Sequence, residues 1–141
     1  MVFIAASITF ALDQLTKYFI NNRFSLHESL PIIKGVFHLT LVHNRGAAFG
    51  LLQNQIPFLI LTSIFAIYLI YSNLKAGKHG KIYSLALGLI LAGAAGNLID
   101  RIFLGYVIDF LDFRIWPVFN LADSAITVGA GLLGYSIISK R

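Results

Sequence analysis

Four apolar segments dominate this chain of 141 residues. They cover residues 1–20, 56–74, 82–99 and 120–138, and each is close to the roughly 20 residues that a helix needs to cross a bilayer. Charged residues make up only 12% of the sequence, whereas a soluble domain carries about 25%. The pattern predicts a mainly α-helical membrane protein with four transmembrane helices in a single domain, residues 1–141.

The basic residues between these segments predict the orientation of the chain. Three lysines lie in the short connection 75–81, and the sequence ends in Lys140 and Arg141. Short loops rich in lysine and arginine stay in the cytoplasm. Both termini are therefore expected in the cytoplasm, with the longer connections 21–55 and 101–119 on the opposite side. The net charge of +5 is explained by this topology, and no nucleic-acid partner is expected.

The two longer connections differ in character. Residues 37–42 alternate between apolar and polar or smaller side chains, which predicts a half-buried strand. Residues 101–119 are apolar and aromatic but are interrupted by Gly105 and Pro117. This second connection is expected to lie at the membrane interface, where an aromatic residue such as Trp116 is favoured.

Acidic residues mark the most informative part of the sequence. The chain has six, and four of them, Asp100, Asp109, Asp112 and Asp123, lie within 24 positions around the ends of the third and fourth apolar segments. Ionisable residues at membrane depth are rare and indicate functional sites. Two carboxylates in such a place would share one proton, and a pair of this kind can hydrolyse a peptide bond.

Small residues precede Asp100 and follow Asp123 at helical intervals, so both acids are expected to face the inside of a helix bundle. Spacing alone therefore pairs Asp100 with Asp123. Structural roles are open as well. Asn120 and Asp123 have the spacing of a helix N-cap and its third residue, and Asp100 beside Arg101 could form an interfacial ion pair.

Other classes of membrane protein can be compared with this sequence. There is no cysteine, no histidine pattern of a metal site, no zinc-protease motif and no serine elbow, so neither a metal nor a cofactor is expected. A small proton-coupled transporter could use the same carboxylates as a relay, and a membrane scaffold could use them only as helix caps.

Five blocks of sequence occur in order along nearly the whole chain. They are DQLTK at 13–17, NRGAAFG at 44–50, GAAGNLIDR at 93–101, GYVIDFLDF at 105–113 and FNLADSAI at 119–126. By these blocks and their order, the chain resembles the bacterial lipoprotein signal peptidases, or type II signal peptidases.

The resemblance implies an intramembrane aspartic endopeptidase with a small extracytoplasmic β-sheet, in the bacterial cytoplasmic membrane. Such an enzyme removes signal peptides from diacylglyceryl-modified prolipoproteins by cutting before the lipidated cysteine. The expected partners are these substrates and membrane lipids. A monomer would suffice, and the active site would lie at the extracytoplasmic face.

By the same resemblance, Asp109 and Asp123 would be the catalytic pair, and Asp100 would take a supporting role instead. Asp112 is expected to be exposed. The residues that would bind substrate or hold the two acids are Asn44, Gly46, Asn97, Asp100, Arg101 and Asn120, while Asp13 and Lys17, which have the spacing of a helix salt bridge, would tie the first span to the outer region.

Overall fold

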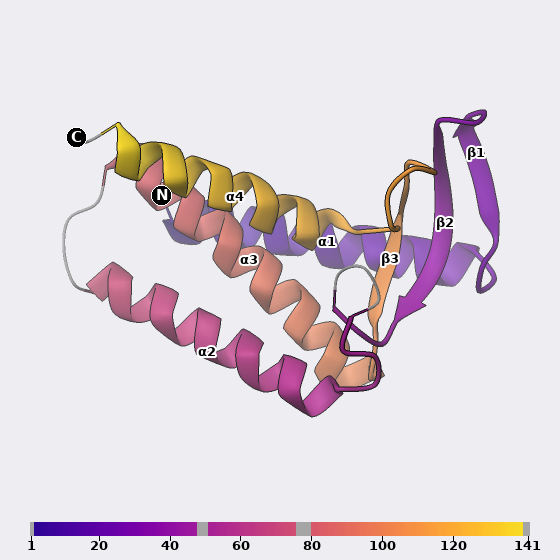
Figure 1. The fold of residues 1–141 in the computed structure, drawn as a ribbon, viewed down its shortest axis with the longest axis horizontal. Helices are drawn as coiled ribbons and strands as arrows, with labels where there is room; N and C mark the ends of the chain where they lie inside the picture. The colour runs from indigo at the N-terminus through magenta and orange to yellow at the C-terminus, as the bar shows by residue number, and fades with distance from the viewer. Residues whose placement is uncertain (1, 48–50, 76–79, 140–141) are drawn as a thin grey trace.

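The computed structural model describes residues 2–47, 51–75 and 80–139. Within these residues, the elements follow in the order α1 (Val2–Arg23), β1 (Ser29–Ile33), β2 (Phe37–Asn44), α2 (Ile56–Lys75), α3 (Lys81–Leu104), β3 (Val107–Asp112) and α4 (Leu121–Ile138). The helices run lengthwise along the molecule, and the strands lie at one end of the bundle (Figure 1). The start of α1 and the end of α4 lie at the opposite end.

The helices agree with the predicted fold class, a mainly α-helical membrane protein with a small sheet. Among the described residues, α2, α3 and α4 are long and apolar enough to cross a membrane. Helix α1 has 22 residues but carries Asp13, Gln14 and Lys17 in its second half, which lowers its apolar character. Helix α3 continues beyond the predicted end at residue 99 to Leu104. The predicted start of the first span at Met1 and the basic residues Lys78, Lys140 and Arg141, which were used to predict the orientation, lie outside the described residues.

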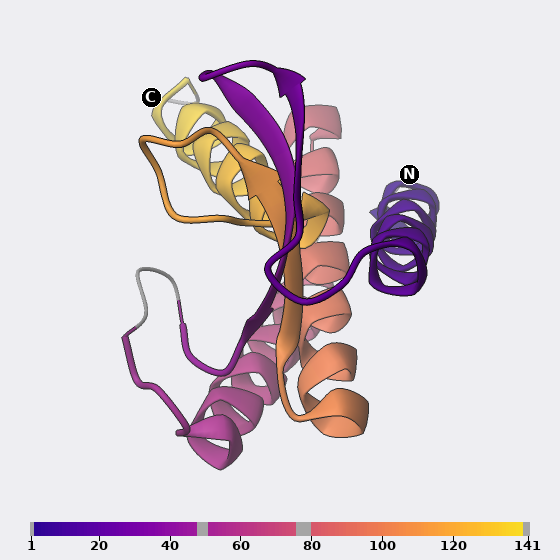
Figure 2. The ribbon, with the colours of Figure 1, turned by 90° about the vertical axis from the view of Figure 1, so that its right-hand side faces the viewer.

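Helix α3 is the centre of the bundle, because it contacts α1, α2 and α4. Figure 2 shows α1 and α2 on different sides of it. Small buried residues, including Ala92 on α3 and Ala122 on α4, allow the two helix backbones to approach closely. Large apolar side chains such as Phe3 on α1 and Phe65 on α2 are exposed, as expected of surfaces that face lipid.

The three strands form one antiparallel sheet in the order β1–β2–β3. The predicted strand at residues 37–42 is confirmed, and β2 extends it to Asn44. Strand β3 was not expected from the residue pattern of connection 101–119. The side chains of residues 113–117, which follow β3, are exposed.

Strand β3 places its side chains on two faces by the alternation of a β-strand. Ile108 and Phe110 pack with Leu41 of β2 in the core of the sheet, whereas Val107 and Asp109 line a cavity. The chain reaches this strand through Gly105, which caps the C-terminus of α3 with φ of 77°. That left-handed conformation is readily adopted by glycine, so α3 ends here and the chain turns back along β2.

Candidate active site

A cavity of about 940 Å³ lies where the sheet meets the helices. Its walls come from β2, β3, the connection 113–119 and the adjoining parts of α3 and α4, and both Asp109 and Asp123 line it. Many of the other lining residues are apolar, among them Ile126 and Val128 of α4. The cavity therefore joins two carboxylates to an apolar surface that continues along a membrane-spanning helix.

Asp109 is 1% exposed and lies on β3. Its Oδ2 accepts a hydrogen bond of 3.0 Å from Nδ2 of Asn44, and its Oδ1 accepts one of 2.7 Å from Nδ2 of Asn120. Burial and the nearby Asp123 carboxylate raise the pKa of Asp109 to about 7, although the hydrogen bonds from both asparagines and the charge of Lys17 oppose this shift. Asp109 can therefore hold a proton near neutral pH.

Asp123 lies in the first turn of α4, where the predicted N-cap is confirmed as a capping box. The side chain of Asn120 accepts from the backbone N–H of Asp123 at 2.8 Å, and Asp123 Oδ2 accepts from the backbone N–H of Asn120 at 3.3 Å. Its other oxygen, Oδ1, accepts from Nδ2 of Asn97 at 2.7 Å. The capping role and a place in the cavity are thus compatible.

The four carboxylate oxygens of Asp109 and Asp123 share one feature. Each accepts a hydrogen bond from a nitrogen of an asparagine, and these asparagines are Asn44, Asn97 and Asn120. Neutral amide donors hold a carboxylate in place without adding a counter-charge that would fix it as ionised. The arrangement thus holds both carboxylates in place through neutral donors from the same three asparagines.

Asp100 does not belong to this pair. It is buried and forms an ion pair of 2.8 Å with Lys17, and its Oδ2 also accepts from the backbone N–H of Ile108 at 3.3 Å. The pairing of Asp100 with Asp123 from helical spacing is therefore wrong. The sequence also left open an ion pair between Asp100 and Arg101. The structure shows that the ion-pair partner of Asp100 is Lys17 on α1.

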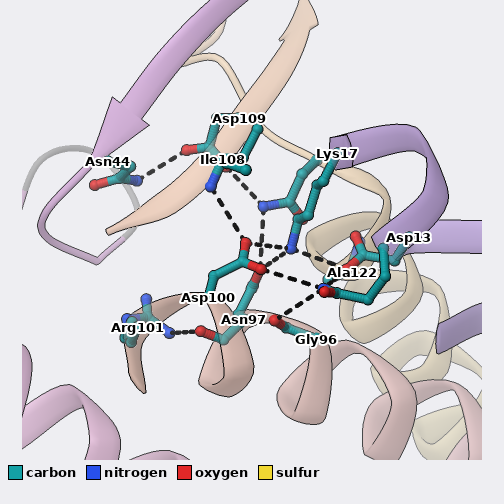
Figure 3. A network of polar contacts seen from close by, with 12 residues as sticks. Asp13, Lys17, Asn44, Gly96, Asn97, Asp100, Arg101, Ile108, Asp109 and Ala122 are labelled. Atoms are coloured by element: carbon teal, nitrogen blue, oxygen red, sulfur yellow. Dashed lines mark hydrogen bonds and ion pairs between the residues drawn. The ribbon is translucent and has the colours of Figure 1, made fainter. Parts of the chain in front are cut away.

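Asp13 and Lys17 form the predicted salt bridge, at 2.9 Å. Both side chains are buried, and Figure 3 shows Lys17 among Asp13, Asp100 and Asn97. Asp13 Oδ1 also accepts from the backbone N–H of Ala122 at 2.8 Å. The pair ties α1 to α3 and to the start of α4, beside the two acids rather than in the outer region alone.

Arg101 and Gly46 meet beside the cavity. The guanidinium of Arg101 donates to the backbone oxygens of Gly46, at 3.3 Å, and Asn97, at 3.4 Å. The backbone N–H of Gly46 donates to Oδ1 of Asn44 at 2.9 Å. Arg101 lines the cavity, and its buried Nε has no hydrogen-bond partner in the described residues. The last part of the NRGAAFG block, residues 48–50, lies outside them.

Residue patterns missed two parts of this site. Gln14 donates to Asp100 Oδ1 at 3.2 Å and to the backbone oxygen of Gly96 at 3.3 Å. Its position next to Asp13 in a mostly apolar helix could have indicated such a polar contact. The apolar residues 115–119 form one wall of the cavity. They carry no polar pattern that would reveal such a role.

The expectation that Asp112 is exposed is wrong. The residue is 5% exposed; Thr40 on the neighbouring strand donates to its carboxylate at 2.7 Å, and Arg114 pairs with it at 2.8 Å. Within the part of the chain that the structure describes, no group of three or more histidine, aspartate or glutamate residues could hold a metal ion.

The chain is similar to known proteins over most of its length. The signal peptidase II family (SPase II) matches residues 5–139. A lipoprotein signal peptidase of Halothermothrix orenii is 51% identical over 134 residues, which are 94% of this chain and 92% of that protein. A lipoprotein signal peptidase of Caldanaerobacter subterraneus is 51% identical over 141 residues, covering 99% of this chain and 96% of its own length.

Two solved structures are similar to this chain over most of its length. A bacterial membrane enzyme determined by the in meso method at 2.3 Å resolution superposes with a TM-score of 0.92 and 31% identity, over 98% of this chain and 87% of its own. A second, at 1.9 Å resolution, superposes with a TM-score of 0.89, also at 31% identity, over 99% of this chain and 94% of its own. The chain belongs to the signal peptidase II family of peptidases.

Proposed function

We propose that this protein is an aspartic endopeptidase in which Asp109 and Asp123 form the catalytic pair. The observation that carries the proposal is that two carboxylates from separate elements, β3 and α4, line one cavity and are each held by asparagine amides. One domain supplies the whole site, so a monomer suffices.

The reaction follows from one proton shared between two acids. Asp123, as the carboxylate, takes a proton from a water molecule, and the resulting hydroxide attacks the carbonyl carbon of the scissile peptide. Asp109 gives its proton to the carbonyl oxygen. When the tetrahedral intermediate collapses, the C–N bond breaks, the leaving amine takes the proton from Asp123, and Asp109 recovers its own. No metal or cofactor takes part in these steps.

Membership of the family and the apolar lining of the cavity support a proposal for the substrate class. We propose that the substrate is a prolipoprotein whose cysteine carries a diacylglyceryl group, cut just before that cysteine. The apolar wall formed by residues 115–119, with Ile126 and Val128, would contact the acyl chains and the signal helix. Arg101 and Asn44 would donate hydrogen bonds to peptide carbonyls next to the scissile bond.

A proton-coupled transporter is less compatible with this arrangement. Transporters of that kind place their sites near the middle of the membrane, at interrupted helices. Here α3 and α4 are continuous over their described lengths, and the two acids lie at the sheet end of the bundle.

Incubation of the purified protein with a diacylglyceryl-modified prolipoprotein, followed by electrophoresis, tests the proposal. Release of the signal peptide from the lipidated substrate, and not from the same precursor without lipid, is the expected result. Proton flux into proteoliposomes without any cleavage would instead favour the transporter.

Cleavage is expected to decline as the pH rises through about 7. Asp109 must carry a proton to donate it, and its pKa is about 7, so the alkaline limb of the rate profile should have an apparent pKa in that region. The measurement is kcat/KM in buffers of increasing pH, because this ratio follows the protonation of the free enzyme. A kcat/KM that stays constant far above this pH would contradict the role of Asp109 as the acid.

The orientation of the chain can be tested with two cysteine variants, because the protein has no cysteine of its own. We propose that both termini are cytoplasmic and that the sheet lies on the extracytoplasmic side. Lys34, between β1 and β2, and Lys75, at the end of α2, are both exposed. In intact cells, an impermeant maleimide should label Lys34→Cys but not Lys75→Cys, and the opposite pattern would reverse the proposed orientation.

A further inference from the structure

Lys17 is a buried cation that touches neither of the two cavity acids. Its side chain is almost completely covered, at 2% exposure, and its ammonium has three partners. These are Oδ2 of Asp13 at 2.9 Å, Oδ2 of Asp100 at 2.8 Å and Oδ1 of Asn97 at 2.9 Å. An ammonium has three N–H groups and no acceptor, so these partners use its full capacity.

The contact with Asn97 determines which way that amide points. Because Lys17 can only donate, it must face the oxygen of the Asn97 side chain. The amide nitrogen then faces the opposite way, and its N–H donates to Oδ1 of Asp123 at 2.7 Å. A flipped Asn97 would place its NH₂ group against the ammonium and its oxygen against a carboxylate, and both contacts are repulsive.

The same oxygen of Asn97 transmits this constraint to Asn120. It accepts a second hydrogen bond, of 3.1 Å, from Nδ2 of Asn120. The other N–H of that nitrogen donates to Oδ1 of Asp109 at 2.7 Å, and the oxygen of Asn120 accepts the backbone N–H of Asp123. The ammonium therefore sets the orientation of Asn97, and the orientation of Asn120 is set jointly by the oxygen of Asn97 and by the backbone N–H of Asp123.

We propose that Lys17 is a positioning residue for the reaction: it orients Asn97, and through Asn97 it supports Asn120, so that N–H donors, rather than carbonyl oxygens, face Asp123 and Asp109. This inference rests on the proposed function. A role as a helix tether alone requires only the ion pairs with Asp13 and Asp100. The third bond, to Asn97, is the one that orients a donor toward the acids.

Several other charged groups surround the two acids, and each of them can influence how the rate depends on pH. Asp13 on α1 and Asp100 on α3 carry charges that oppose Lys17 directly, and Arg101 on α3 lines the cavity. On β2, His43 lines it as well, and burial lowers the pKa of His43. Lys17 therefore acts on the acids in two ways that work in the same direction: its positive charge favours the ionised form of Asp109, and its hydrogen bond keeps the N–H of Asn97 toward Asp123.

Replacing Lys17 by glutamine tests the inference. The glutamine side chain has an oxygen as well as N–H groups, so Asn97 can flip in Lys17→Gln, and Asp123 then loses a donor that stabilises its charged form. The positive charge is lost too, and both changes favour the protonated acids. The rate profile of cleavage, normalised to the maximum of each variant, should move toward alkaline pH by about one pH unit or more.

Two controls separate this effect from a loss of packing. Lys17→Arg keeps a side chain that only donates, so its profile should stay at the wild-type pH even if its rate is lower. Gly88→Ala crowds a contact between α3 and α1 at Val2 and Ala5 without touching Lys17 or Asn97, so it should lower stability but leave the profile in place.

The outcomes distinguish the inference from the proposed function. If the wild type cleaves the substrate and Asp109→Asn does not, the proposed function stands. An unchanged pH profile in Lys17→Gln would then reject only the proposed role of Lys17. A shift of equal size in Lys17→Arg would also overturn it.

A second variant serves if Lys17→Gln does not fold. Lys17→Gln with Asp100→Asn leaves one less unpaired buried charge, and it should show the same alkaline shift relative to Asp100→Asn alone. Failure of the double variant to fold would overturn the inference, because Lys17 would then be required for folding and not for the acids.

Discussion

Asp109→Asn and Asp123→Asn are each expected to lower the rate of prolipoprotein cleavage by at least about 100- to 10,000-fold. Asparagine has almost the same shape as aspartate, but it can neither give up nor accept a proton in the reaction. The asparagine at position 123 can still accept the backbone N–H of Asn120, so the start of α4 should be kept. The measurement is kcat in detergent, together with circular dichroism to confirm the helical content.

The stability of the folded protein, unlike its activity, is not expected to fall in Asp109→Asn. Burial raises the pKa of Asp109 from 3.8 to about 7, so the native state binds a proton that the unfolded chain releases between these values. The stabilisation that this proton provides is complete below the unfolded pKa and is lost as the pH rises through about 7. Asp109→Asn removes the buried charge, and above neutral pH it should be at least as stable as the wild type.

The matched control is Asp112→Asn. This residue lies on the same strand and is also buried, but its partners are Thr40 and Arg114 and it does not line the cavity. Cleavage should therefore stay within a few-fold of wild type. Equal losses in Asp109→Asn and Asp112→Asn would show that β3 tolerates no change in charge, and the catalytic pair would lose its support.

Gly96→Ala is expected to lower the free energy of unfolding by about 1–3 kcal/mol, the usual cost of overpacking. A Cβ atom at position 96 would lie 2.5 Å from Oδ2 of Asp13, which is the oxygen that pairs with Lys17. Any displacement of this carboxylate weakens a buried ion pair, and breaking such a pair costs about 3–5 kcal/mol. Denaturant unfolding in detergent, followed by circular dichroism, measures the loss.

Gly131→Ala provides the comparison for this variant. Gly131 lies inside α4, and a Cβ there would meet nothing within 4 Å. Alanine is favoured over glycine in a helix by about 1 kcal/mol, so this variant should be no less stable than the wild type. If both variants lost the same stability, the contact between Gly96 and Asp13 would not be the cause.

The helices were predictable because each apolar run is long enough to dominate its own region of sequence. Strand β3 was not, because its residues are apolar or acidic without clear alternation. They become two distinct faces only when β2 pairs with the strand, with the sheet core on one side and the cavity on the other. That environment comes from residues far away in the sequence.

The acids illustrate the same limit. Helical spacing placed Asp100 and Asp123 on inward faces, and both do face the bundle. Which partner each acid meets depends on the turn at Gly105 and on the sheet register that sets Asp109 opposite Val42. Asp112 was misjudged because Thr40, its hydrogen-bond partner, lies 72 positions earlier. The bridge between Asp13 and Lys17 was predictable because both groups lie on one helix turn.

The capping box at the start of α4 means that position 123 answers two demands at once. Its oxygen closes the first turn of a helix, and in the proposed reaction the same carboxylate accepts the proton of the attacking water. Substitutions there should fall into two groups: asparagine keeps the turn and abolishes cleavage, whereas an aliphatic residue also leaves the backbone N–H of Asn120 without its acceptor. An aliphatic variant should therefore lose helix stability as well as activity, and the difference between the two variants measures what the cap contributes.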